Sequence, residues 1–202
     1  MRDTYDNYKE LCKNEALNKD YRFSWRRGKT NSIIIAPHGG NIEPGTTEIA
    51  DAVADKDHSF YSFEGVKPGG NGALHITSTS FDEPYGVHLV KSATNVLAIH
   101  GCGGDEDIVY IGGLDMALKM KIQGFLIRAG FKTAEHDNPE LKGIHRANIC
   151  NRGKKTQGVQ LELSFGLRKK MFFGLKANDR NKKTRLFETF VLSLKRALIN
   201  CE

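Results

Sequence analysis

Residues 32–54 read SIIIAPHGGNIEPGTTEIADAVA, and this stretch decides the fold class of the chain. Residues 32–36 form a short apolar run rich in β-branched side chains, which is typical of a buried strand. A helix is predicted through residue 54, with Thr46 or Thr47 as its N-cap. A glycine-rich polar turn separates the two elements. The stretch therefore predicts a strand–loop–helix unit of an α/β protein.

The alternation of strand and helix patterns continues along the whole chain. Apolar runs and alternating patterns predict further strands at residues 59–63, 74–77, 95–99, 107–111 and 158–164. Helical spacing of apolar side chains predicts helices at residues 1–20, 114–129 and 184–199. From this order we expect an α/β fold with an open, mixed, mostly parallel sheet flanked by helices. The length of 202 residues fits one domain over residues 1–202.

Composition excludes several classes of protein. No apolar run approaches the about 18 residues of a membrane-spanning helix, and residues 1–20 lack the apolar core of a secretory signal. We therefore expect no membrane association and a cytoplasmic location as synthesised. The four cysteines are far apart and form no Cys-x-x-Cys pair: Cys12, Cys102, Cys150 and Cys201. We expect neither a cysteine zinc site nor a disulfide framework, and thiols that are reduced.

Positive charge is concentrated in the second half of the chain. The net charge is +6, and residues 142–185 hold 13 basic residues against only Glu162 and Asp179. Such a block favours a polyanionic partner, which could be nucleic acid, an anionic polypeptide or a polysaccharide. A solvated basic face that serves solubility is the alternative. Residues 154–155 and 168–170 are expected to provide general electrostatic attraction.

Histidines and acidic residues stand at or near the ends of three predicted strands. His38 and Glu43 follow the first strand, His100 follows the strand at residues 95–99, and Glu162 lies within the last strand. Polar side chains at strand carboxyl ends can converge on one point of an open α/β sheet. Two imidazoles and one carboxylate would hold zinc and leave a fourth position for water. Glu162 lies on the polar face of its strand and would act as a separate general base.

Each of these residues also has a structural interpretation. The histidines could be hydrogen-bonded structural residues, Glu43 could be a helix-entry acid, and Glu162 could pair with a basic neighbour. The spacing from His38 to Glu43 does not identify a zinc motif by itself. His75 lies in apolar surroundings and is expected to be a core histidine.

Arginines suit a substrate that carries carboxylates, because the guanidinium group binds a carboxylate with two hydrogen bonds. Arg146 and Arg152 lie shortly before the Glu162 strand. Either could clamp a substrate carboxylate or stabilise an oxyanion, and the alternative is an arginine in contact with solvent.

Five segments, taken together and in order, resemble the poly-γ-glutamate hydrolase family of phages and prophages of Bacillus-type bacteria. They are APHGGNIEPGTTEIA (36–50), FYSFEG (60–65), LHITSTSFDEP (74–84), AIHGCGG (98–104) and NRGKKTQGVQLELS (151–164). The resemblance implies a zinc-carboxypeptidase-like fold, one zinc ion and hydrolysis of γ-glutamyl amide bonds. It places His38, Glu43 and His100 at the ligand positions and Glu162 at the position of the base.

The resulting hypothesis is a monomeric zinc hydrolase acting on polyanionic poly-γ-glutamate, with no nucleic-acid or membrane partner. Glu162 would take a proton from water and pass it to the leaving amine. Arg152, with Arg146 as a second candidate, would stabilise the oxyanion or hold a neighbouring carboxylate. The alternatives are a zinc amidase or carboxypeptidase acting on another substrate, such as cell-wall peptide, and a basic nucleic-acid-binding module. Release by lysis would bring the protein to an extracellular polymer.

Overall fold

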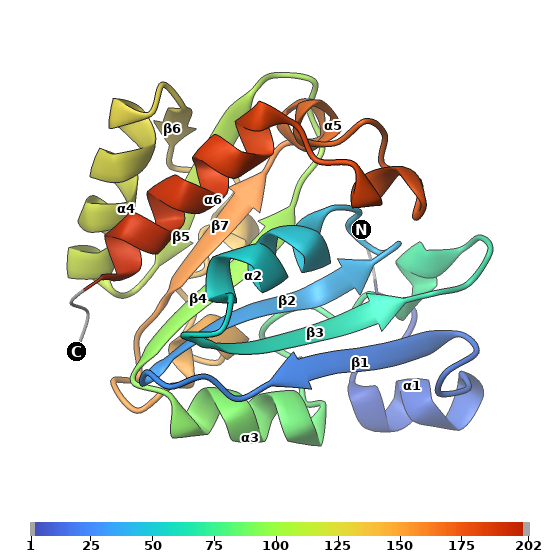
Figure 1. Cartoon of the computed structure of the whole chain (residues 1–202). Helices are drawn as coiled ribbons and strands as arrows, with labels where there is room; N and C mark the ends of the chain where they lie inside the picture. The colour runs from blue at the N-terminus through green and yellow to red at the C-terminus, as the bar shows by residue number, and fades with distance from the viewer. Residues whose placement is uncertain (1–2, 200–202) are drawn as a thin grey trace.

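Helices cover both sides of a seven-stranded sheet in the computed structural model, which describes residues 3–199 (Figure 1). The strands are β1 (Tyr21–Arg26), β2 (Ser32–Gly40), β3 (Ser59–Gly65), β4 (Asn95–Gly101), β5 (Ile108–Gly113), β6 (Lys132–Ala134) and β7 (Val159–Leu163). Their order in the sheet is β1-β3-β2-β4-β7-β5-β6. β1 is antiparallel to β3 and β5 is antiparallel to β7, whereas the other neighbours are parallel. The predicted open, mixed, mostly parallel sheet is confirmed.

The helices form two layers against this sheet. They are α1 (Tyr8–Asn14), α2 (Thr46–Ala54), α3 (Pro84–Ser92), α4 (Met116–Arg128), α5 (Phe165–Met171) and α6 (Arg185–Leu198). Four short 3-10 helices connect them: η1 (Asn71–Leu74), η2 (Pro139–Leu141), η3 (Ile149–Asn151) and η4 (Asp179–Asn181). Helices α2, α4 and α6 pack on one face, and α1 and α3 pack on the other (Figure 1). No helix within residues 3–199 is both long and apolar enough to cross a lipid bilayer.

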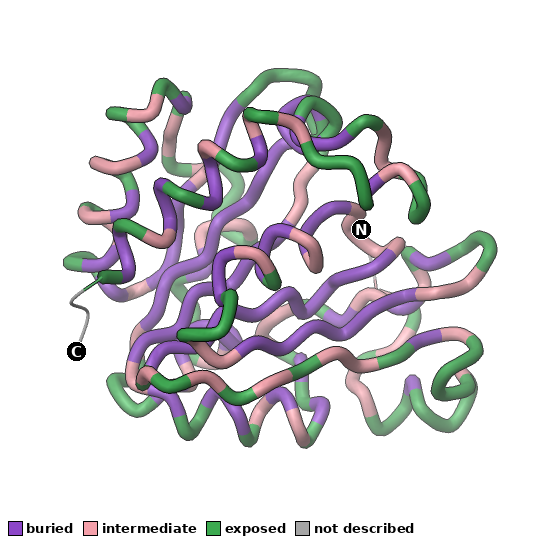
Figure 2. The backbone as a smooth tube through the Cα atoms, in the orientation of Figure 1, coloured by how far each residue is buried: buried purple, intermediate pink, exposed green. Residues whose placement is uncertain are grey.

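The central strands are buried on both faces, as Figure 2 shows in purple. In β2, Ile34 packs into the core under α2, α4 and α6, while Ile33 packs into the second core against α1 and α3. This burial explains why the strand is an almost continuous apolar run. In β7 the apolar side chains fill the first core. Glu162 therefore faces the second-core side, as its position in the strand predicted.

The predictions for residues 1–20 and 74–77 were wrong. The predicted helix at residues 1–20, of which residues 1 and 2 lie outside the described part, shortens to α1. Asn7 caps α1 by accepting a hydrogen bond from the Glu10 N–H, and this fixes where the helix begins. The predicted strand at residues 74–77 does not form, because the Thr77 N–H donates to the side chain of Asp3 instead of a neighbouring strand.

Helix α2 ends at the predicted residue 54, but the predicted threonine cap is wrong. Gly45 is the N-cap, with a φ of 99° in the left-handed region that favours glycine. The Thr46 hydroxyl donates to the carbonyl oxygen of Glu43 and so tightens the turn before the helix.

Candidate metal centre

A local irregularity in β2 turns His38 toward the candidate site. The register between β2 and β3 shifts between Ala36 and Gly39, and Pro37, which has no N–H to donate, lies within this shift. His38 Nε2 lies 2.8 Å from the carbonyl oxygen of Ile76, so this nitrogen carries the proton that it donates. In the neutral ring, His38 Nδ1 is therefore left as an acceptor.

Glu43 joins the end of β2 to the end of β4. Its backbone N–H donates to the carbonyl oxygen of His38 at 2.9 Å, which closes the turn after the strand. One carboxylate oxygen, Oε1, lies 3.0 Å from His38 Nδ1. The other oxygen, Oε2, accepts a hydrogen bond of 2.8 Å from the backbone N–H of Gly101. The carboxylate is thus held between the two strand ends.

His100 and Glu162 lie side by side on the neighbouring parallel strands β4 and β7, where their Cα atoms are register partners. His100 Nδ1 is 3.2 Å from His38 Nδ1 and 3.7 Å from Glu43 Oε2. The amide of Gln160 donates to Glu162 Oε1 at 2.9 Å. The structure therefore brings all four predicted residues to one edge of the sheet, and their chemical roles remain predictions.

The donor set fits a metal ion. His38 Nδ1, His100 Nδ1 and the Glu43 carboxylate face one another at 3.0–3.7 Å. Zinc bonds of about 2.1 Å in a tetrahedron place two ligand atoms about 3.4 Å apart, which agrees with this spacing. The buried His100 Nε2 has no hydrogen-bond partner among the described residues, so no hydrogen bond on that side holds the ring. A cation between these three acceptor groups would give each of them a partner.

The two carboxylates of the site have opposite pKa shifts. Burial opposes ionisation of Glu43, but the adjacent His38 and His100 rings outweigh it and hold the pKa of Glu43 below its usual range. Burial, reinforced by the negative charge of Glu43, raises the pKa of Glu162 well above its usual range. One carboxylate is suited to bind a cation and the other to hold a proton, a division that is common in active sites.

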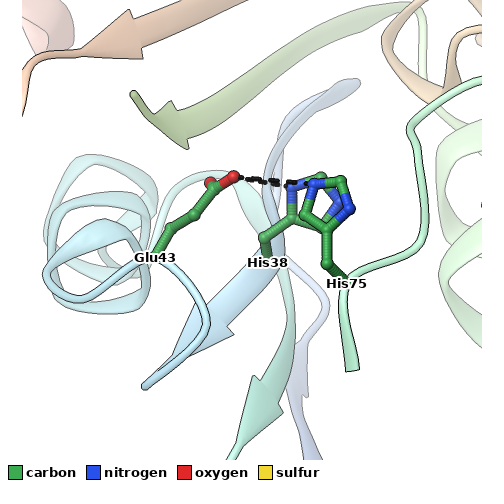
Figure 3. Close-up of side chains that lie close together, drawn as sticks. All are labelled: His38, Glu43 and His75. Carbon is green, nitrogen blue, oxygen red and sulfur yellow. Dashed lines mark hydrogen bonds and ion pairs between the residues drawn. The ribbon is translucent and has the colours of Figure 1, made fainter. Parts of the chain in front are cut away.

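His75 is the functional candidate whose position the sequence analysis missed. Figure 3 shows His38, Glu43 and His75 close together, and each offers a ligand atom within 4.8 Å of the others. The His75 ring lies against the His38 ring at a centroid distance of 3.9 Å. Asp3 Oδ1 lies 2.6 Å from His75 Nδ1, which leaves Nε2 toward Glu43 at 3.9 Å. His75 thus borders the cluster with a partly exposed side chain and is not a core histidine, and contacts with residues distant in the chain place it there.

The structure gives the two predicted arginines different surroundings. The Arg152 guanidinium donates to three backbone carbonyl oxygens, those of Ala147, Phe81 and Thr79. Arg146 is exposed. Within residues 3–199, no hydrogen bond or ion pair joins either arginine to Glu43 or Glu162. Their catalytic role stays a prediction.

Arg168 contradicts the expectation that residues 168–170 serve only general attraction. Its side chain is buried, with 4% of the residue exposed, and its charge interacts with the charges of Glu43 and Glu162. Lysines 169 and 170 are exposed, as expected. The three basic residues look alike in the sequence, but α5 turns only Arg168 inward.

The fold and the cluster define an α/β protein with side chains at the carboxyl edge of its sheet that could hold a metal ion. The chain belongs to the poly-gamma-glutamate hydrolase family, whose model matches residues 5–193. The resemblance seen in the sequence is confirmed.

Relatives in Bacillus subtilis (strain 168) support this assignment. UPF0714 protein YndL is 35% identical over 190 residues, which cover 92% of this chain and 74% of YndL. SPbeta prophage-derived UPF0714 protein YoqZ is 37% identical over 172 residues, 84% of this chain and 62% of YoqZ. The matched part of YoqZ is thus less than two thirds of its length.

Two solved structures share the fold. A bacteriophage poly-gamma-glutamate hydrolase has a TM-score of 0.93 and 32% identity, covering 97% of this chain and 96% of that chain. An apo, zinc-free form of YndL has a TM-score of 0.93 and 34% identity, with 98% of each chain covered.

Proposed function

We propose that this chain is a single-domain zinc hydrolase that cleaves the γ-glutamyl amide bonds of poly-γ-glutamate. The observation that supports this most directly is the convergence of His38, Glu43 and His100, with Glu162 in register beside His100. Membership of the family supports the substrate. The existence of a form of YndL described as zinc-free supports zinc as the metal.

His38 Nδ1, Glu43 and His100 Nδ1 would hold the ion. The contact between His38 Nε2 and the Ile76 carbonyl keeps the His38 ring oriented with Nδ1 toward the site. The hydrogen bond from the Gly101 N–H keeps the Glu43 carboxylate toward the two rings. A bound zinc ion would act as a Lewis acid and lower the pKa of water at the site toward neutrality. Asp3 orients His75 at the border of this cluster.

Glu162 would carry the proton during hydrolysis. Its carboxylate takes a proton from the attacking water while the water oxygen bonds to the scissile γ-carbonyl carbon. The same group then donates that proton to the nitrogen of the leaving amine, so that the amide bond breaks and Glu162 is regenerated. Gln160, which donates to Glu162 Oε1, fixes the direction of the carboxylate. Arg152 and Arg146 remain the proposed partners for the oxyanion or a flanking substrate carboxylate.

The first experiment is metal analysis of the purified protein combined with loss of viscosity of a poly-γ-glutamate solution. We expect about one zinc per chain, a fall in viscosity, and loss of activity with a chelator that added zinc restores. Cell-wall peptide fragments are assayed in parallel. Cleavage of those fragments alone would favour the zinc amidase or carboxypeptidase. Salt-dependent DNA binding by a metal-free, inactive protein would favour the nucleic-acid-binding module.

We expect activity on the polymer to depend on salt through KM. Helix α5 follows the carboxyl end of β7 (Figure 1). Exposed cations lie within α5 and in the segment that follows it in the chain, among them Lys169, Lys176 and Lys182. Raising the ionic strength from 0.1 M to 1 M shortens the screening length from about 10 Å to about 3 Å. KM should therefore rise several-fold while kcat stays constant. A KM that does not change with salt would contradict polymer binding by these cations, and a short γ-glutamyl oligomer with fewer carboxylates should show a smaller change.

A further inference from the structure

One buried guanidinium touches all three strand ends that carry the site. Arg168 Nε donates to the carbonyl oxygen of Leu163 at 3.1 Å, directly after Glu162. The two terminal nitrogens donate to the carbonyl oxygens of Pro44 at 2.8 Å and Cys102 at 2.9 Å. Pro44 is the residue after Glu43, and Cys102 is two residues after His100. Three hydrogen bonds from one planar group thus connect the loops after β2, β4 and β7.

The backbone of Gly101 packs closely against the guanidinium group of Arg168. A Cβ atom added at Gly101 would lie 2.5 Å from Arg168 Cζ, so the guanidinium lies directly against the Gly101 backbone. The N–H of the same glycine donates to Glu43 Oε2. A shift of Arg168 would therefore displace both the end of β4 and the Glu43 carboxylate.

The negative charges around Arg168 favour a guanidinium group that stays in this position. Burial lowers the pKa of Arg168, and the negative charges of Glu43 and Glu162 are among those that counteract this effect. An arginine stays charged in either case. Its positive charge in turn partly opposes the rise in the pKa of Glu162.

We propose that Arg168 is the positioning residue of the site: its guanidinium group sets the spacing of the loops that carry Glu43, His100 and Glu162. Because each of its three nitrogens donates to a backbone carbonyl oxygen next to the site, we infer that it acts through these residues and does not touch the substrate. The catalytic consequence rests on the proposed function. The effect on the loops does not, because Arg168 contacts them through backbone carbonyl oxygens and not through a bound group.

The test compares Arg168→Lys and Arg168→Gln with the wild-type protein. Lysine keeps the charge but cannot present three donors in one plane, so it separates the shape of the group from its charge. We expect both variants to bind zinc about 10–100-fold more weakly in a competition titration, the range typical of residues that orient metal ligands. We expect kcat to fall at least tenfold in zinc-saturated protein with little change in KM, because Arg168 does not touch the substrate.

Amide hydrogen exchange of the zinc-free protein supplies a readout that needs neither metal nor activity. The amides of Gly101 and Cys102, which donate to Glu43 and to the Leu163 carbonyl, should lose protection in Arg168→Lys, while those of α6 keep it. Arg196, exposed on α6, gives the matched controls Arg196→Lys and Arg196→Gln. These controls should match the wild-type protein in every measurement.

The outcomes distinguish this inference from the proposed function. If Arg168→Lys has wild-type zinc affinity and wild-type hydrogen exchange, the positioning role is overturned. This holds even if Arg168→Gln is impaired, because a positive charge alone would then be enough to maintain the site. A wild-type protein without zinc or hydrolysis would overturn the proposed function while the exchange comparison still tests Arg168. If Arg168→Lys fails to fold, Gly101→Ala displaces the intact guanidinium from the other side. It should show the same loss of protection at Cys102, and wild-type protection there would contradict the proposal.

Discussion

Replacing Glu162 with glutamine should reduce turnover by orders of magnitude while leaving the fold and the bound metal in place. The carboxamide cannot accept the proton of water, so kcat should fall by about 10²–10⁴-fold, the contribution of a general acid–base group. Glutamine has nearly the same shape, and its carbonyl oxygen can still accept the hydrogen bond that Gln160 donates to Glu162 Oε1. Steady-state kinetics on poly-γ-glutamate, zinc content and thermal unfolding are the measurements.

The matched control is Glu188→Gln, which makes the same change at an exposed glutamate of α6. This variant should keep wild-type kcat and zinc content. A Glu162→Gln protein with wild-type turnover would remove Glu162 from the mechanism. Loss of both zinc and turnover would instead assign this residue to the metal site.

Replacing His38 with alanine should produce a protein without zinc. His38 lies at the centre of the cluster, 3.0 Å from Glu43 Oε1 and 3.2 Å from His100 Nδ1. Its removal should weaken zinc binding by more than the about 100-fold seen for residues that only orient a ligand. The buried Ile76 carbonyl also loses its partner, at a cost of about 1–3 kcal/mol in unfolding free energy. Zinc content is therefore measured at low temperature on folded protein, with His88→Ala, at an exposed histidine of α3, as the control.

Parallel alanine variants of His100 and His75 decide which histidine completes the ligand set. We expect His100→Ala to lose zinc and His75→Ala to retain most of it. The reason is that His100 Nδ1 is within 3.7 Å of both other donors, whereas His75 Nε2 is 3.9 Å from Glu43 and is oriented by Asp3. Retention of zinc at full stoichiometry in His38→Ala would refute the whole set. If instead His75→Ala loses zinc and His100→Ala retains it, His75 takes the place of His100 in the ligand set.

Much of the fold and the geometry of the candidate site followed from local patterns. The apolar run at residues 32–36 and the helix through residue 54 were predicted because burial and helical spacing leave a direct mark on neighbouring residues. The convergence of His38 and His100 was predicted because parallel strands end at one edge of a sheet. Local patterns failed where a residue distant in the chain provides the partner. The segment at residues 74–77 resembles a strand, yet the side chain of Asp3 occupies its backbone donor.

The sequence by itself determined the family, the α/β class and the kinds of ligand atom available, because these depend on residue type and short-range order. Only the tertiary structure decided which histidines face Glu43 and which basic residue of the run at 168–170 is buried. Asp3 and His75 meet across 72 positions of the chain, and Arg168 meets the carbonyl of Pro44 across 124. Such contacts depend on how the strand ends are placed in three dimensions, and no local periodicity encodes them.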